Sequence, residues 1–321
     1  MMDISNVVIV STAASYYFAE KIAQQLGLEV TATKRHTFGG GEKYYRIGFE
    51  SYEDIIGKSA IFVGSTDTDE NINELYRVGC ALAKWGTKQR IFMIPFLGYS
   101  TMERAKEVGE VVTAKTIARQ LSSIPNSGLG NFFLFLDLHV AGLVHYFEGD
   151  CKTQELYGEQ ELAANITGEI THETGTENVI FASADLGRPR WVSSFARMYK
   201  TGIALIDKSR DFETTKIAHV IGDVRGKIVI IYDDMTRSAG TIIDAAKAYL
   251  DLGAIAVYVV LSHLALNDES IIAKLIAAPI VKIITTNSHP MSQHPLILGS
   301  EKFVVADVST GFARMASLIT R

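Results

Sequence analysis

Two adjacent acidic residues, Asp233 and Asp234, directly follow the apolar residues 229–232, and a loop of small residues, 238–241, comes soon after. Carboxylates accept hydrogen bonds, so they suit the hydroxyl groups of a sugar. Small side chains at the start of a helix let a phosphate approach backbone N–H groups that have no partner within the helix. The stretch VIIYDDMTRSAGT therefore predicts a site for a phosphorylated sugar. The alternative is an N-capping Ser238 with two solvated aspartates, which two acids directly after an apolar strand do not favour.

Short apolar runs alternate with amphipathic segments along the chain, which is the pattern of parallel βαβ units. Ligands of such folds bind at the carboxyl ends of the strands, where the acidic pair lies. The helix expected after the loop has apolar residues at positions 242, 245, 246, 249 and 250, the spacing of a helix that buries one face. The predicted strands are residues 7–11, 60–63, 90–94, 132–136, 179–182, 203–206, 228–232, 257–261 and 282–286.

The same order of elements occurs twice. In the first half, the pair GK at 57–58 leads into a strand, the turn GSTDTDE and a helix ending at Gly86. In the second half, GK at 226–227 leads into a strand, the turn DDMTRSA and a helix ending at Gly253. The earlier segments VVIVST and TKRHTF likewise match VIFASA and DKSRDF. Chance likeness between βαβ units is the alternative, but four elements recurring in order favour duplication.

Duplication divides the chain into a first domain, residues 1–150, and a second domain, residues 151–303, with the sugar-phosphate loop. We expect residues 304–321 to form a C-terminal helix that packs back on the first domain. The first copy has Gly64, Ser65, Thr66 and Asp67 where the second has its acids and small residues, so we expect the first loop to serve another purpose.

The composition is that of a soluble globular protein, with 321 residues, 47% of them hydrophobic and 21% charged. A net charge of -5 and a pI near 5.9 argue against nucleic acid or an anionic membrane as a partner. The two cysteines, Cys80 and Cys151, have no metal-ligand spacing and indicate no disulfide framework. The first residues do not read as a signal peptide, and no apolar run is long enough to span a membrane. We expect a cytoplasmic protein.

Several segments resemble one enzyme family. IVIIYDDMTRSAGT resembles the phosphoribosyl-diphosphate binding loop of type I phosphoribosyltransferase-fold proteins. FFLFLDLHVAGLVHYF, STDTDENINELYRVGCALAKWGTKQRIFMIPFLGYSTMER, ASADLGRPRW and ALIDKSRDF resemble segments of ribose-phosphate pyrophosphokinases, in the same order and over nearly the whole chain. GYSTMERAKEVGEVVTAKTIARQLSSIPNS and HYFEGD are most similar to the class II form. The resemblance implies an α/β fold of two tandem phosphoribosyltransferase-like domains, each a mainly parallel sheet flanked by helices.

The resemblance implies transfer of the β,γ-diphosphoryl group of a nucleoside triphosphate, such as ATP, to O1 of ribose 5-phosphate. This reaction needs an aligned acceptor hydroxyl, Mg²⁺ on the triphosphate and cations that meet the spreading charge. The family match assigns the last role to Lys208 and Arg210 in a flexible loop; without it they would be read as solvated cations. The ribose 5-phosphate residues implied are Asp233, Asp234, Thr236, Arg237, Ser238, Ala239, Gly240 and Thr241.

The metal–nucleotide site implied by the family consists of His139, Asp185 and Asp137. By residue type alone His139 would be a core or hydrogen-bonding histidine, because Mg²⁺ prefers oxygen ligands. Arg237 departs from the acid that many relatives have, and it could bind the 5-phosphate, point to solvent or pair with Asp233. The segment 186–191 departs from the family's Gly-Gly pattern, and we have no account of it.

The nucleotide-binding residues implied are Phe38, Glu42, Glu103, Arg104 and His139. The family's Phe-Ser-Asp-Gly-Glu hairpin reads FGGGE here, with Gly40 for the Asp, and its Arg-Gln-Asp-Arg segment reads TMER. A base contacted by fewer charged and amide groups is read less strictly, so we predict relaxed choice among ATP, GTP and other triphosphates. Relatives usually borrow this hairpin from a neighbouring subunit, which implies a homo-oligomer, a dimer or larger.

Two other functions compete with the synthetase. A catalytically weak relative could bind and regulate an active synthetase, which the drifted TMER segment favours. Retention of the predicted catalytic, metal and ribose residues together argues against it. A phosphoribosyltransferase would need one domain and would leave residues 7–150 without a purpose.

Overall fold

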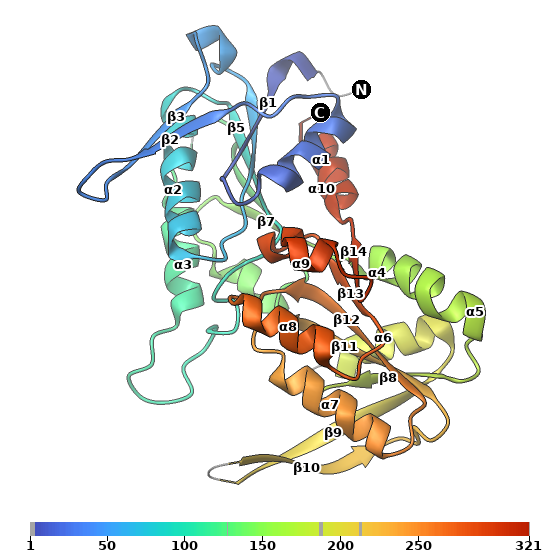
Figure 1. Ribbon diagram of the computed structural model, residues 1–321. Helices are drawn as coiled ribbons and strands as arrows, with labels where there is room; N and C mark the ends of the chain where they lie inside the picture. The colour runs from blue at the N-terminus through green and yellow to red at the C-terminus, as the bar shows by residue number, and fades with distance from the viewer. Residues whose placement is uncertain (1–3, 127, 186–188, 212–213, 321) are drawn as a thin grey trace. The chain divides into compact units, whose positions relative to one another are not determined.

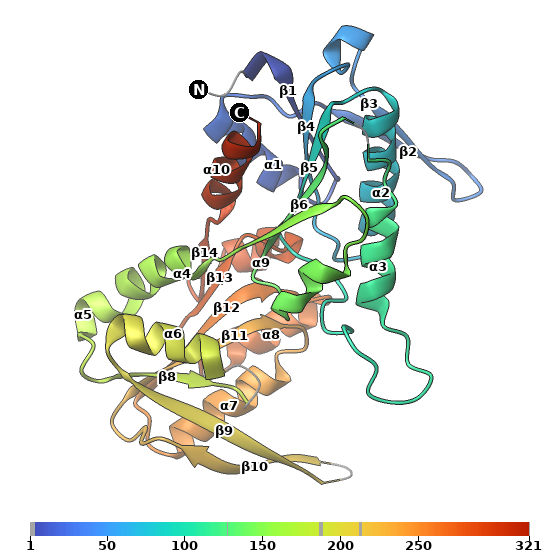
Figure 2. The ribbon, with the colours of Figure 1, turned by 180° about the vertical axis from the view of Figure 1, so that it is seen from behind.

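The computed structural model describes residues 4–126, 128–185, 189–211 and 214–320, with the side chains of 173, 189–190 and 208–219 outside the description (Figures 1 and 2). The chain forms two compact units. Unit 1 comprises Met1–Tyr157, Ser288–Pro290 and Val308–Arg321, and unit 2 comprises Gly158–Asn287 and Met291–Asp307. No helix among the described residues is both long and apolar enough to cross a membrane.

Unit 1 is built on a five-stranded sheet in the order β1-β4-β5-β6-β7, with every neighbouring pair parallel. Every residue of β1, β4 and β5 is buried, as expected for a parallel sheet covered on both faces. The strands are β1 (Val7–Ser11), β4 (Ser59–Val63), β5 (Gln89–Ile94), β6 (Gly130–Leu136) and β7 (Lys152–Leu156).

Helices cover both faces of the first sheet. The helices α2 (Asp69–Lys84) and α3 (Thr113–Ser122) pack on one face, and α1 (Tyr16–Leu26) and α10 (Ser309–Ile319) pack on the other. Figures 1 and 2 both show α1 and α10 side by side, and the rings of Phe18 and Phe312 meet edge-on with centroids 5.5 Å apart. The C-terminal helix thus completes the core of unit 1. Short 3-10 helices are η1 (Ile4–Asn6), η2 (Tyr52–Asp54) and η3 (Ala141–Tyr146).

The strands β2 (Thr33–Thr37) and β3 (Lys43–Ile47) form a separate antiparallel hairpin, which extends away from the rest of unit 1 (Figure 1). Its base is fixed by Arg35, whose Nε donates to Oε1 of the buried Glu74 on α2 at 2.8 Å. Arg35 also donates to the carbonyl of Ser11 at 2.7 Å, so the hairpin is fastened to both a helix and a strand.

Unit 2 contains a seven-stranded sheet in the order β10-β9-β8-β11-β12-β13-β14, parallel except for the pair of β9 and β10. The helices α7 and α8 pack on one face, and α4 and α6 pack on the other. The strands are β8 (Val179–Ser183), β9 (Gly202–Asp211), β10 (Thr214–Ile221), β11 (Ile228–Thr236), β12 (Ala256–Leu264), β13 (Ile283–Thr286) and β14 (Phe303–Ala306). The helices are α4 (Glu159–Ile166), the π-helix η4 (Thr167–Thr171), α5 (His172–Thr174), α6 (Pro189–Tyr199), α7 (Gly240–Asp251), α8 (Glu269–Ala277), η5 (Pro290–Gln293) and α9 (Pro295–Leu298).

The backbone repeats where the sequence predicts duplication. Gly57 N–H donates to the carbonyl of Gly86 at 2.8 Å, and Gly226 N–H donates to the carbonyl of Gly253 at 2.9 Å. All four glycines have positive φ, a conformation that side chains disfavour, so the same closure uses glycine in both units.

The predicted fold class is confirmed, and every predicted strand is present. Two boundaries differ. Residues 151–157 belong to unit 1 because β7 extends the first sheet, and residues 304–306 belong to β14 of the second sheet rather than to the C-terminal helix. The strand β7 has one buried residue, so it lacks the apolar run that would have revealed it.

Candidate functional site

The acidic pair lies within a strand rather than in a loop, which corrects our prediction. β11 continues to Thr236, and Asp233 is opposite Leu261 of β12. Pairing with β8 on the other side ends at Tyr232, next to Ser183. Asp234 is 4% exposed and Asp233 is partly buried, so neither is a freely solvated carboxylate.

The charges of two predicted carboxylates of unit 2, Asp234 and Asp185, act on a third, Asp233. Burial, followed by the charges of Asp234 and Asp185, raises the pKa of Asp233 well above its ordinary value. The backbone N–H of Asp234 donates to Oδ1 of Asp233 at 2.9 Å and offsets part of this effect. Asp185 follows β8 and Asp233 lies on the neighbouring β11, so adjacent strands bring these residues together at their carboxyl ends. Such a cluster favours hydroxyl donors or a cation.

Helix α7 helps to fix the end of β8. Tyr249 of α7 donates its hydroxyl hydrogen to the carbonyl of Ser183 at 2.8 Å, and the Ser183 hydroxyl donates to the carbonyl of Asp185.

Trp191, from the segment 186–191 that departs from the family pattern, stacks on Tyr232 of β11 with ring centroids 5.8 Å apart. Trp191 therefore packs against the strand that holds the acidic pair.

The loop after β11 leads into an uncapped helix N-terminus. Ala239 is the N-cap residue of α7, with φ of 62°, and no side chain accepts a hydrogen bond there. The alternative in which Ser238 caps the helix is therefore wrong. The side chains of Arg237, Ser238 and Thr241 are exposed, and Arg237 forms no ion pair within the described part of the chain.

Gly240 leaves space at this N-terminus. A Cβ atom built there would meet only the Ser238 hydroxyl oxygen, at 3.9 Å, so packing within the protein does not require glycine.

Backbone strain also occurs at the predicted sites. Among described residues, the non-glycine positions with positive φ are Tyr99, Asp137, Lys200 and Ala239. Two of them, Asp137 and Ala239, are predicted site residues. Strained positions persist where the surrounding structure fixes them, and they cluster at functional sites.

The corresponding loop of unit 1 is filled by its own chain. The Thr68 hydroxyl caps α2 by accepting from Asn71 N–H at 3.2 Å, and the Ser65 hydroxyl donates to the carbonyl of Ser288 at 3.0 Å. The Thr66 hydroxyl accepts from Gly98 N–H at 2.9 Å, and a Cβ at Gly98 would lie 1.9 Å from the Thr66 carbonyl oxygen. These contacts leave the first loop unsuited to phosphate, in contrast to the loop before α7.

The backbone of Lys208 and Arg210 lies in β9, where they pair with Ile217 and Thr215 of β10. The segment that was expected to be a loop is thus one strand of an antiparallel hairpin, paired with the β-branched residues of β10, and its flexibility stays a prediction. The positions of these two side chains lie outside the described part of the structure.

Unit 1 contains the predicted nucleotide residues on three segments. Asp137 and His139 directly follow β6; Asp137 is buried with φ of 40°, and His139 is partly exposed. Glu103 and Arg104 form an ion pair at 3.3 Å on the segment before α3. On the hairpin, Glu42 is exposed and Phe38 is 51% exposed.

The hairpin tip presents an aromatic cluster that the sequence did not predict. Phe38 meets His36 edge-on at 4.8 Å and Tyr44 at 6.2 Å between ring centroids. His36 and Tyr44 are opposite each other on β2 and β3, and Phe38 follows β2 at the turn, so the pairing register brings the three rings together.

Within the described residues, no group of three or more His, Cys, Asp or Glu side chains is arranged to hold a metal ion. Mg²⁺ usually keeps several waters and is bound through one or two carboxylates together with substrate phosphates. The oxygen donors around Asp233 are of the type that fits such a shared ion.

Comparison with known families decides the classification. Residues 7–124 match the N-terminal domain of ribose phosphate pyrophosphokinase, and residues 213–319 match the phosphoribosyl synthetase-associated domain. The chain belongs to the ribose-phosphate pyrophosphokinase family.

Relatives of this chain carry the name of this family, and a solved structure has the same fold. A ribose-phosphate pyrophosphokinase of Caldanaerobacter subterraneus is 29% identical over 92% of this chain and 89% of its own. One of Fusobacterium nucleatum is 28% identical over 100% of this chain and 97% of its own. The fold is that of the phosphoribosylpyrophosphate synthetase from Mycobacterium smegmatis. The two structures match over 98% of each chain, with a TM-score of 0.84 and 22% sequence identity.

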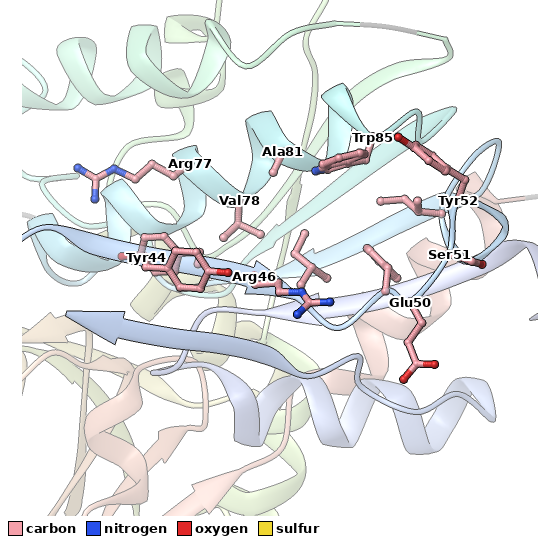
Figure 3. A pocket seen from close by; sticks show the side chains of 13 residues that line it. Tyr44, Arg46, Glu50, Ser51, Tyr52, Arg77, Val78, Ala81 and Trp85 are labelled. Carbon is pink, nitrogen blue, oxygen red and sulfur yellow. The ribbon is translucent and has the colours of Figure 1, made fainter. Parts of the chain in front are cut away.

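A cavity of about 620 Å³ in unit 1 contains none of the predicted site residues (Figure 3). It lies between β3, η2 and α2. Its labelled lining includes Tyr44, Arg46, Tyr52, Arg77 and Trp85. The sequence did not indicate this cavity, because three separate segments form it only after folding.

Proposed function

We propose that this protein is a ribose-phosphate diphosphokinase. It transfers the β,γ-diphosphoryl group of a nucleoside triphosphate, such as ATP, to O1 of ribose 5-phosphate and releases phosphoribosyl diphosphate and AMP for nucleotide biosynthesis. The main support is one observation in unit 2: the acidic pair Asp233–Asp234 lies just before the uncapped N-terminus of α7, in a chain of this family. The segments GYSTMERAKEVGEVVTAKTIARQLSSIPNS and HYFEGD, which resemble the class II form, support assignment to that form.

In this proposal the acidic pair accepts hydrogen bonds from the ribose hydroxyls, which orients the sugar. The backbone N–H groups at the start of α7 bind the 5-phosphate, and the N-terminal end of the helix dipole favours its charge. Ser238 and Thr241 add hydroxyl donors, and the exposed Arg237 adds a cation. Thr236, the last residue of β11, and Ala239 complete the proposed ribose 5-phosphate site.

Mg²⁺, when bound, neutralises charge on the triphosphate and on the group transferred. Asp185, with His139 and Asp137, would hold the metal–nucleotide. Lys208 and Arg210 would meet the charge that develops on the diphosphoryl group.

Phe38, Glu42, Glu103, Arg104 and His139 would contact the nucleotide. Their few charged and amide groups support relaxed base selection. We therefore expect rates with GTP and other triphosphates to be within about tenfold of the rate with ATP, since roughly 1.4 kcal/mol separates tenfold differences. Initial rates at saturating ribose 5-phosphate measure this. Strict dependence on ATP, with no detectable activity on GTP, would refute relaxed selection.

The proposed activity is tested by incubating purified protein with Mg-ATP and ribose 5-phosphate and assaying AMP and phosphoribosyl diphosphate. A substitution of Gly240→Val should raise the KM for ribose 5-phosphate by at least about tenfold, because the side chain would occupy the space left for phosphate. Gly311→Val is the matched control, since Gly311 is also in the first turn of a helix with nothing near its Cβ.

The alternative functions predict other outcomes. A regulatory relative would bind ribose 5-phosphate without forming product, and it would raise or lower the activity of an added synthetase.

We also propose that the protein is a cytoplasmic homo-oligomer, a dimer or larger, without a nucleic-acid partner. Light scattering coupled to gel filtration measures the assembly, and a monomer at working concentration would contradict it.

A further inference from the structure

The segment from His139 to Glu148 joins two of the proposed nucleotide-contacting segments. The 3-10 helix η3 (Ala141–Tyr146) begins two residues after His139 and ends at Tyr146. The Tyr146 hydroxyl donates a hydrogen bond to the backbone carbonyl of Glu103. One short helix therefore connects the position of His139 to the position of Glu103.

Glu103 lies in a long irregular connection. Residues 95–112, between β5 and α3, contain no helix or strand. The side chain of Glu103 is 15% exposed, and its ion-pair partner Arg104 is 74% exposed. A long connection of this kind has few regular hydrogen bonds to fix it, so a side-chain contact to its backbone restricts it.

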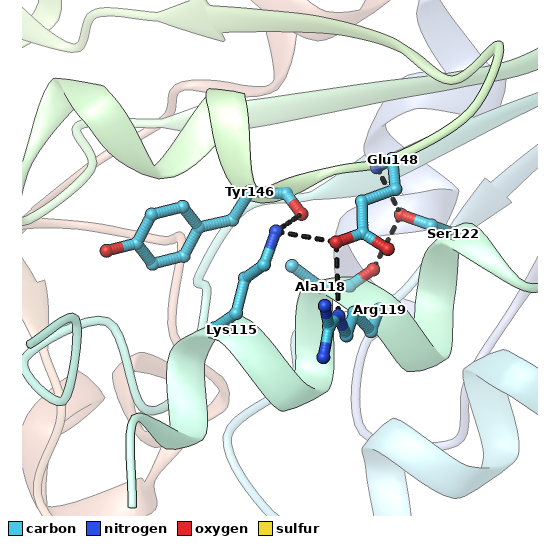
Figure 4. Close-up of polar contacts among 6 residues, drawn as sticks. All are labelled: Lys115, Ala118, Arg119, Ser122, Tyr146 and Glu148. Atoms are coloured by element: carbon cyan, nitrogen blue, oxygen red, sulfur yellow. Dashed lines mark hydrogen bonds and ion pairs between the residues drawn. The ribbon is translucent and has the colours of Figure 1, made fainter.

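Tyr146 is itself fixed from helix α3 (Figure 4). Lys115 Nζ donates to the carbonyl of Tyr146 at 3.1 Å and lies over its ring, 5.3 Å from the centroid. Lys115 also forms an ion pair with Glu148 at 2.8 Å, which Arg119 shares at 3.1 Å. The Glu148 N–H donates to the Ser122 hydroxyl at 2.9 Å.

We propose that Tyr146 is a positioning residue for the nucleotide: its hydroxyl fixes the backbone of Glu103 so that Glu103 and Arg104 are presented at a set place relative to His139. This inference rests on the proposed function, which assigns these three residues to the nucleotide. Tyr146 acts through Glu103 and does not touch the ligand. Its contact restricts the connection before the nucleotide arrives, which lowers the ordering cost of binding.

The test is the Tyr146→Phe variant, which removes one hydroxyl and keeps the ring beneath Lys115. We expect the KM for the nucleotide to rise about two- to tenfold, the range that one neutral hydrogen bond accounts for. The KM for ribose 5-phosphate should remain unchanged, because its proposed residues lie on β11 and α7. A loss of folded protein alone would lower active enzyme and kcat, but it would not shift one KM selectively.

Tyr199→Phe is the matched control. Tyr199 also donates its hydroxyl hydrogen to a backbone carbonyl, that of Ala163, at 2.6 Å, but Tyr199 belongs to unit 2, whereas the proposed nucleotide residues belong to unit 1. Both variants lose a tyrosine hydroxyl that donates to a backbone carbonyl, and Tyr199→Phe also loses a hydrogen bond with the Thr167 hydroxyl. Only Tyr146→Phe should change the nucleotide KM. Equal effects of the two variants, or no effect of Tyr146→Phe, would overturn the inference.

A second pair of variants tests the support from α3. Lys115 contacts both Tyr146 and Glu148, whereas Arg119 contacts only Glu148 of these two. Lys115→Met should therefore raise the nucleotide KM in the same direction as Tyr146→Phe, and Arg119→Met should leave it unchanged. A larger effect of Arg119→Met than of Lys115→Met would contradict a role through Tyr146.

Failure of the proposed function is distinguishable from failure of this inference. Calorimetry with α,β-methylene ATP and Mg²⁺ measures nucleotide affinity without turnover. If the wild-type protein forms no product but binds this analogue, weaker binding by Tyr146→Phe alone still supports the inference. Unchanged affinity in Tyr146→Phe, or no binding by the wild-type protein, overturns it.

Discussion

Its surroundings in the folded protein disfavour the ionised form of Asp233. Its carboxyl is partly buried beside Asp234 and Asp185, and its pKa is raised mainly by burial and then by these charges. A group with a raised pKa in the folded state binds its proton more tightly there than in the unfolded chain. Its contribution to stability is fully present below the unfolded pKa and is lost as the pH rises through the folded pKa.

We predict that Asp233→Asn raises the melting temperature of the ligand-free protein at about pH 7.5. Asn keeps the oxygen that accepts from Asp234 N–H, but it has no charge to lose stability as the pH rises. For a domain of this size, each gain of about 1 kcal/mol in the free energy of unfolding raises the melting temperature by roughly 2–4 °C. Thermal unfolding monitored by circular dichroism from about pH 4 to pH 8 measures the difference, which should shrink towards acid pH.

Asp223 provides a control of opposite sign. Its backbone and side-chain contacts with Arg225 lower its pKa, and it is exposed. Asp223→Asn should therefore give no stabilisation at neutral pH. If Asp233→Asn is destabilising at neutral pH and neutral in acid, the inferred direction of the Asp233 pKa is wrong.

At the scale of elements, the two helices that follow the repeated loops begin in different ways. The helix α2 is capped by Thr68 of its own chain, whereas α7 has no side-chain cap after Ala239. An unsatisfied helix N-terminus binds an anion, while a capped one is already satisfied. The two corresponding helices, α2 and α7, therefore differ in whether a side chain caps their N-terminus.

This contrast gives a paired prediction. Thr68→Ala should reduce the free energy of unfolding by about 0.5–2 kcal/mol, the usual cost of losing an N-cap. Ser238→Ala should change stability little, because its hydroxyl does not cap α7, yet it should weaken binding of ribose 5-phosphate. Urea denaturation measures the first quantity and calorimetry the second. A stability loss in Ser238→Ala equal to that in Thr68→Ala would contradict the assignment of the uncapped helix.

At the scale of the whole molecule, the chain returns to unit 1 after forming unit 2. Residues Ser288–Pro290 and Val308–Arg321 belong to unit 1, and α10 contributes the fully buried Phe312 to its core. Unit 1 therefore depends on the last residues of the chain. Its core cannot be completed by a continuous N-terminal segment.

Phe312→Ala should destabilise unit 1 by about 3–5 kcal/mol, because it removes a fully buried ring in contact with Phe18. Leu318→Ala on the same helix is the control, since Leu318 is 50% exposed and should cost less than about 0.5 kcal/mol. Hydrogen exchange at the amides of α1 and β1 reports on this unit. Unchanged protection in Phe312→Ala would show that α10 is dispensable for the core.

Buried parallel strands were predictable because they are continuous apolar runs, as in β1, β4 and β5. The strands that were missed are β2, β3, β7, β10 and β14. β2 and β3 form an exposed hairpin, β7 has one buried residue, and β14 has four residues. β2, β3 and β7 depend on a partner strand rather than on their own hydrophobicity, so no local apolar pattern indicates them.

The sequence by itself determined the fold class, the repeated order of elements and the residue types that suit a phosphorylated sugar, because these depend on local periodicity and on side-chain chemistry. Only the tertiary structure decided that Asp185 shares its charge environment with Asp233, that α7 is uncapped while α2 is not, and that Tyr146 holds Glu103. The physical reason is that pKa, capping and backbone restraint depend on distances between segments far apart in the chain, and those distances are set by packing.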